Sequence, residues 1–375
     1  MGLIGDALEP NNLRVMFEVL HKGRDLWEDL RDDAAFARTA LRKLTPLSRF
    51  ESPPGVPDPI FPPKRPLHVP SLQGKRIALL ASGGSGATAA LCGIKRALEE
   101  ADLDVCAISA CSGAVLWGSL WAQGMDAETM GRSWLSLRTS DYLDPGWGGL
   151  ARAPLRMFRR WGGMIRGEAI ERTYQRWLGP DTRIGATRIP LWAVVWNIDL
   201  NRVEFLGTHT SPELPLARAV RCAISIPIFV EPVRIGGHWY GDGGIVDILP
   251  ARPLLDDLDS YDLVIATNSY LPEGFLGQDI GDWYDRRLAI LRASGQLRYA
   301  IYLELAREHV RQMGAKLRLL EPVPHEEVRG AHFYQSFLDR TSWPKYMRWG
   351  LEAARAMLEA EARPEAGFRP PPPGS

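Results

Sequence analysis

The sequence of 375 residues has no excess charge of either sign and few cysteines. Lys plus Arg and Asp plus Glu both number 45, so no net field favours nucleic acid or another polyanion. None of the seven histidines lies at a metal-ligand spacing, which predicts no metal site and no cofactor. The cysteines are too few and too irregularly spaced for a disulfide framework or a zinc site. They are Cys92, Cys106, Cys111 and Cys222, and we expect reduced thiols in a cytoplasmic protein.

The sequence also lacks a long apolar run and a secretory signal at its start. The longest apolar window, AVLWGSLWAQG, is too short to span a bilayer and contains Gly118. The first residues, MGLIGDALEPNN, carry acids and no basic region, and Asp6 stands where a myristoylation motif requires Ser or Thr. We therefore expect at most a peripheral attachment to a membrane.

Four regions follow one another along the chain. Residues 1–50 are predicted to form a helical extension, because apolar residues recur at helical spacing over 11–48. Residues 51–74 are rich in proline and are interpreted as an extended linker. Residues 75–362 are predicted to form the main folded domain, and the tail 363–375 is expected to be disordered. The extension can serve as a cap, as a contact in a homo-oligomer or as a dock for a partner protein.

Residues 75–275 alternate between buried strands and helices. RIALLAS and DVCAISA are continuous apolar runs, and each is followed by a helical pattern, ATAALCGIKRALEEA and GAVLWGSLWAQG. This order predicts a parallel sheet with right-handed crossovers. IPLWAVVWNIDL and LVIATNSYL are predicted to be further strands, and 281–317 and 343–362 are predicted to be helices. The fold class is therefore α/β.

The first strand ends in a glycine-rich turn, SGGSGATA, where a helix begins. Backbone amides at such a helix start suit a phosphate or an oxyanion. No lysine follows, which argues against a P-loop, and the second strand lacks the acidic residue that a dinucleotide site requires at its end. The remaining interpretation is an oxyanion hole built from the amides of Gly83, Gly84, Ser85 and Gly86.

The second strand runs into another turn, ISACSGA, at residues 108–114. A nucleophile elbow needs small residues two before and two after the nucleophile, because side chains there collide in the tight turn. Cys111 has Gly113 two residues later and Ser109 two earlier, whereas Ser112 lacks a glycine at both positions. The spacing favours Cys111 as nucleophile. Ser112 as a displaced nucleophile, and Cys111 as a small core residue without activity, are the alternatives.

Three segments in this order resemble the patatin-like phospholipase family. They are GGSGAT at 83–88, SACSG at 109–113 and YGDGGIVDILP at 240–250, within a similarity that covers roughly residues 75–275. The resemblance implies a three-layer α/β/α fold with a mostly parallel central sheet. It also implies that Asp242 orients and deprotonates the nucleophile, and that Gly243 and Gly244 let the backbone bring this carboxylate close. A plain Asp-Gly turn is the alternative for Asp242.

The sequence departs from the family pattern at several of these positions. The nucleophile position holds Cys111 instead of serine, Ser85 replaces a glycine, Ala87 replaces a basic residue and Ile248 replaces an asparagine. A helix start lowers the pKa of a thiol, whereas a neighbouring carboxylate raises it, and the sequence leaves this balance open. A triad that uses His309, His325 or His332 is the second catalytic layout.

Together with the residues, the resemblance implies an acyl hydrolase or acyltransferase that acts on a lipid ester or an acyl thioester through Cys111 and Asp242. The N-terminal extension is then a candidate dock for an acyl-carrier partner. A thioester intermediate favours transfer over hydrolysis. The alternative is an inactive lipid- or acyl-binding protein on the same fold. Residues 152–167 mix arginines with apolar side chains, a pattern typical of a membrane-facing helix, of a lid or of an ordinary amphipathic helix packed on the sheet.

Overall fold

The computed structural model describes residues 43, 53, 55–146, 148, 162–270, 289–328 and 331–362. The strands are β1 (Ile77–Ala81), β2 (Ala107–Ala110), β3 (Gly163–Ile165), β4 (Leu191–Asn197), β5 (Arg202–Gly207), β6 (Ile228–Val230), β7 (Val233–Ile235), β8 (His238–Asp242), β9 (Leu263–Thr267) and β10 (Leu317–Leu320). The helices are α4 (Ala90–Glu100), α5 (Gly113–Ala122), α6 (Ala127–Leu135), α8 (Glu168–Leu178), α9 (Leu216–Ala223), α10 (Arg252–Leu255), α11 (Ala289–Met313), α12 (Ala331–Leu338) and α13 (Trp343–Ala362).

The main sheet follows the order β10-β9-β1-β2-β4-β8-β7, with β5 paired to β4. The pairs from β10 to β4 are parallel, whereas β5, β7 and β8 pair antiparallel. Every residue of β1, β2 and β9 is buried, as expected for parallel strands covered on both faces. The predicted α/β fold with a mostly parallel central sheet is confirmed.

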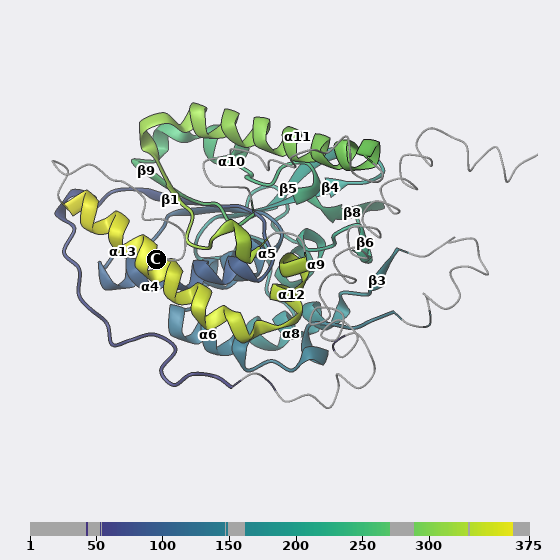
Figure 1. Cartoon of the computed structure of the whole chain (residues 1–375), viewed down its shortest axis with the longest axis horizontal. Helices are drawn as coiled ribbons and strands as arrows, with labels where there is room; N and C mark the ends of the chain where they lie inside the picture. The colour runs from purple at the N-terminus through teal and green to yellow at the C-terminus, as the bar shows by residue number, and fades with distance from the viewer. Residues whose placement is uncertain are drawn as a thin grey trace, which may run out of the picture.

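Helices cover both faces of the sheet, which gives the three predicted layers (Figure 1). Alternate strand residues belong to two separate apolar clusters, because successive side chains point to opposite faces. Leu79 and Ile108 pack in the cluster that contains residues of α4, α5 and α13. Leu80 and Cys111 pack in the cluster that contains residues of α10 and α11.

Strand β4 brings two distant chain segments together. β5 pairs with residues 192–197 along one edge of β4, so β2 and β8 must share the other edge. Ala110, the last residue of β2, pairs with Ala193, and Asp242, the last residue of β8, pairs with Val195. The two strands run in opposite directions, and their carboxyl ends almost meet. The turn after β2 and the turn after β8 therefore meet.

The predicted strands and most predicted helices are confirmed by these elements. Helix α11 covers part of the expected range 281–317, and residues 281–288 lie outside the described part. The predicted extension over 11–48, apart from Lys43, and the tail 363–375 also lie outside it. The proline-rich segment contains neither helix nor strand at 62–69, and Phe61 and Val69 are buried in the core. This part of the segment therefore packs against the domain.

Candidate active site

The turn between β2 and α5 has its strained residue at Ser112. Ser112 has φ 49° and ψ −125°, a conformation that residues other than glycine seldom adopt and that costs about 1–3 kcal/mol. A sharp, strained turn from strand to helix is the geometry that presents the oxygen of a nucleophilic serine. The hydroxyl of Ser112 makes no hydrogen bond with the described part of the chain. The backbone therefore favours Ser112 over Cys111 as the nucleophile.

The glycine that guided the sequence-based choice has another role. A Cβ on Gly113 would lie 2.2 Å from the carbonyl oxygen of Gly84, so the first glycine-rich turn packs directly on this residue. Gly113 is required by that approach, whichever residue reacts. Around Ser112, the positions two before and two after are Ala110 and Ala114, both fully buried and both small. The requirement for small residues is met for Ser112 as well.

Cys111 lies in the apolar layer instead of at the surface of a site. Its side chain is fully buried in the cluster with Val194 and Ile248. Burial raises the pKa of the Cys111 thiol well above its ordinary value, and the carboxylates of Asp242 and Asp247 raise it further, against a smaller opposing effect of the Gly83 amide. The helix start is expected to lower the pKa of the thiol, but the effect of burial is larger, and the thiol is protonated at neutral pH.

Asp242 lies at the end of β8 and faces the turn after β2. It is buried, and its Oδ1 accepts a hydrogen bond from the Gly244 amide at 2.7 Å. A Cβ on Gly244 would lie 3.1 Å from this oxygen and 2.7 Å from Cys111 Sγ. A side chain at position 244 would therefore collide with the sulfur of Cys111 and crowd the carboxylate of Asp242, and these two groups lie close together because residue 244 is glycine. The structure brings the predicted D-G-G segment to the predicted turn.

The amides of the first glycine-rich turn are not equivalent. Gly83 donates to the carbonyl of Ile248 at 2.9 Å, and Gly86 donates to Ser336 Oγ at 3.2 Å. The amides of Gly84 and Ser85 have no acceptor in the described part of the chain. Two of the four amides predicted to form the oxyanion hole are therefore used in the fold, and two are available.

Helix α12 and the start of α13 hold this turn in place. Ser336 Oγ lies 3.0 Å from Ser85 Oγ, and the Ser85 hydroxyl donates to the carbonyl of Phe333. A Cβ on Gly86 would lie 2.1 Å from the carbonyl oxygen of Ser336, which itself accepts from Trp343 Nε1 at 2.7 Å. No sequence signal connected α12 to the turn, because the two are about 250 residues apart.

The remaining predicted residues support the turns. Ser109 Oγ donates to the carbonyl of Pro250 at 2.5 Å and so joins β2 to the segment after Asp242. His309 Nδ1 lies 2.7 Å from the carbonyl of Leu249 and 3.8 Å from Asp247 Oδ1. Within the described residues, no group of His, Cys, Asp and Glu could hold a metal ion.

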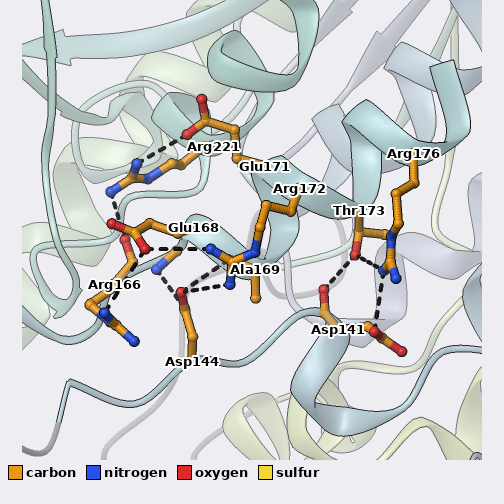
Figure 2. A network of polar contacts seen from close by, with 11 residues as sticks. Asp141, Asp144, Arg166, Glu168, Ala169, Glu171, Arg172, Thr173, Arg176 and Arg221 are labelled. Atoms are coloured by element: carbon orange, nitrogen blue, oxygen red, sulfur yellow. Dashed lines mark hydrogen bonds and ion pairs between the residues drawn. The ribbon is translucent and has the colours of Figure 1, made fainter. Parts of the chain in front are cut away.

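The stretch predicted to face a membrane or to form a lid ends within the fold. Residues 151–161 lie outside the described part, but 163–165 form β3, which pairs with β6. Figure 2 shows that the neighbouring charges are matched: Asp144 accepts from the amides of Gly167 and Ala169, and Arg166 lies 4.0 Å from Glu168. This end of the stretch is a strand with a paired arginine, not a helix with a free basic face.

The fold and site define an α/β/α protein with a nucleophile-elbow turn beside a buried aspartate. Residues 79–255 match the family model described as patatin-like phospholipase. This range contains the serine turn, Asp242 and the first glycine-rich turn. This part of the chain is therefore similar to the patatin-like phospholipase family.

Curated relatives of this chain include proteins of the NTE family. An uncharacterised NTE family protein of Mycobacterium tuberculosis is 29% identical over 196 residues, which is 52% of this chain and 49% of that protein. Lysophospholipase NTE1 of Cryptococcus neoformans is 26% identical over 232 residues, 62% of this chain and 13% of that protein. The chain thus spans about half the length of the former and less of the latter.

Among solved structures, the similarities are distant. VipD from Legionella pneumophila matches with a TM-score of 0.45 and 14% identity, over 76% of this chain and 67% of that chain. ExoU, a type III effector, matches with a TM-score of 0.38 and 13% identity, over 77% of this chain and 53% of that chain. Of the helices in the described ranges, none is both long and apolar enough to cross a bilayer.

Proposed function

We propose that the protein hydrolyses lipid esters, with Ser112 as the nucleophile and Asp242 as its base. The observation that carries this proposal is the strained backbone of Ser112 between β2 and α5. A family described as phospholipase and a relative named lysophospholipase support a lipid ester, with a lysophospholipid as the first substrate to test. An acyl thioester intermediate requires a thiolate at Cys111, which burial disfavours because it raises the pKa of the thiol.

The chemistry needs three groups from three segments. Ser112 Oγ attacks the ester carbonyl carbon while its proton passes to the carboxylate of Asp242, and the amides of Gly84 and Ser85 donate to the oxyanion. The carbon–oxygen bond to the alcohol then breaks, and the proton moves from Asp242 to that leaving alcohol. In the second half, water attacks the acyl-serine and gives up a proton to Asp242. The bond from the acyl carbon to Ser112 Oγ then breaks, Asp242 returns the proton to this oxygen, and the free acid leaves.

A hydroxyl is a weak acid, and an aspartate is a weak base for it. The site therefore has to stabilise the developing negative charge strongly, which preorganised amides in a buried setting do. The start of α5 adds the positive end of a helix dipole at the same turn. These features support hydrolysis by a dyad without a histidine.

Active-site labelling tests the assignment. A long-chain fluorophosphonate should form a covalent adduct, and fragment mass spectrometry should locate it on Ser112. Ser112→Ala should abolish labelling, and Asp242→Asn should slow it strongly. Cys111→Ala should be labelled as fast as the unchanged protein. An adduct on Cys111 would restore the cysteine assignment. Binding of lysophospholipid without any labelling of a folded protein would favour the alternative, a lipid-binding protein without activity.

A further inference from the structure

A second buried carboxylate lies close behind the proposed dyad. Asp247 follows the D-G-G turn, and its amide donates to the carbonyl of Gly243 at 2.9 Å. Its side chain is buried, and Oδ1 has no hydrogen-bond partner within the described residues. An ionised carboxylate with an unpaired oxygen is costly in a protein interior, so the group must be neutral or serve a purpose when charged.

The groups that face Asp247 come from four segments. The imidazole of His309 on α11 approaches to 3.8 Å, which is beyond hydrogen-bonding distance. Its Nδ1 lies 2.7 Å from the carbonyl of Leu249, which can only accept, so Nδ1 carries the hydrogen. Arg252 of α10 acts at longer range, Leu249 supplies a backbone amide, and the charge of Asp247 reaches the Cys111 thiol at the end of β2.

We propose that Asp247 is a positioning residue that works as a neutral carboxylic acid, so that Asp242 supplies the negative charge beside the serine turn. The inference rests on the proposed function. Ester hydrolysis passes through an anionic transition state, and a second carboxylate behind the turn opposes that charge. Release of the Asp247 proton to solvent therefore slows the reaction, and the neutral form permits it.

The direction of the titrations agrees with this geometry. Burial raises the pKa of Asp247 to about 7, against smaller lowering effects of the Arg252 charge and of a hydrogen bond from the Leu249 amide. Burial lowers the pKa of His309, so the imidazole is neutral and offers Asp247 no positive partner at neutral pH. The charge on Asp247 thus changes near neutrality, and its effect is already felt at the residue before Ser112, because it raises the pKa of Cys111.

A pH profile with a matched pair of variants tests the inference. The kcat/KM of the full chain for a soluble ester should fall on the alkaline side with a midpoint near the Asp247 pKa of about 7. Asp247→Asn should remove this decline and exceed the unchanged protein above that pH by on the order of tenfold. Asp256→Asn, an exposed neutral substitution nearby, should keep the decline. An unaltered decline in Asp247→Asn, or loss of its activity at every pH with the fold retained, would overturn the inference.

An infrared measurement separates this inference from the proposed function, because it needs no activity. Below the pKa of Asp247 the spectrum should contain a protonated carboxyl band that disappears above it and that Asp247→Asn lacks. If the band is present and no ester is hydrolysed, the function is wrong and the neutral acid stands. If hydrolysis is observed and the band is missing, Asp247 is charged and the inference fails.

Discussion

The two turns at the carboxyl ends of β1 and β2 are built in different ways. The turn at Ser112 is shaped by its own strained backbone and by the close approach of Gly84 to Gly113. The glycine-rich turn at 83–86 is shaped from far along the chain, by Ser336 and Trp343. The residues that hold it lie beyond the range 79–255 that matches the family model. The proposed nucleophile turn and the proposed oxyanion donors thus depend on different parts of one chain.

The largest effect is expected at the serine turn. Ser112→Ala should lower hydrolysis of a lysophospholipid by roughly a thousandfold or more, because it removes the attacking oxygen. Cys111→Ala should retain most of the activity, since its sulfur is buried and protonated. Release of fatty acid measures both. The reverse pattern would mean that the strained residue only supports the cysteine.

The next effect breaks the long-range support of the glycine-rich turn. Gly86→Ala should lower the free energy of unfolding by about 1–3 kcal/mol, because the new Cβ would lie 2.1 Å from the carbonyl oxygen of Ser336. Gly55→Ala is the matched control, since no atom lies within 4 Å of its Cβ position. Denaturant unfolding of both variants checks the difference. Equal stabilities of the two variants would show that α12 shifts to make room for the new Cβ at little cost in free energy.

Asp247 gives a pH dependence of stability with a definite sign. Its pKa is about 7 in the folded protein and about 3.9 in an unfolded chain. The folded state therefore binds more protons between these values, and stability falls as the pH rises through this window. Each unit of pKa difference corresponds to about 1.4 kcal/mol. Asp247→Asn should lose this pH dependence, and above neutrality it should be more stable than the unchanged protein. Denaturant midpoints measured on both sides of the window would show the difference. A midpoint difference that does not change with pH would contradict this.

The smallest effect sharpens the comparison of the two turns. Ser336→Ala should reduce kcat by roughly tenfold with little change in KM, because the free amides of Gly84 and Ser85 lose part of their support. Ser336→Thr, which keeps the hydroxyl, should recover part of the loss. Gln335→Ala on the same helix is the control. Equal losses in kcat for Ser336→Ala and Gln335→Ala would indicate a general effect on α12.

Much of the fold could be predicted from local patterns. Continuous apolar runs identified β1, β2, β4 and β9, because strands buried on both faces need apolar side chains on both. The D-G-G segment and the two glycine-rich turns were also recognised. The sequence pattern favours Cys111 because Gly113 fits the spacing of an elbow, whereas the structure shows that Gly113 is also needed for its contact with Gly84.

By itself, the sequence determined the order of strands and helices and the three segments that form the site, because burial patterns and turn residues are local properties. Only the tertiary structure decided which of two adjacent residues carries the strained backbone, which amides remain available and which buried carboxylate has an oxygen unpaired among the described residues. Those features depend on contacts between β2, β8, α11 and α12, and such contacts exist only once distant segments pack against each other.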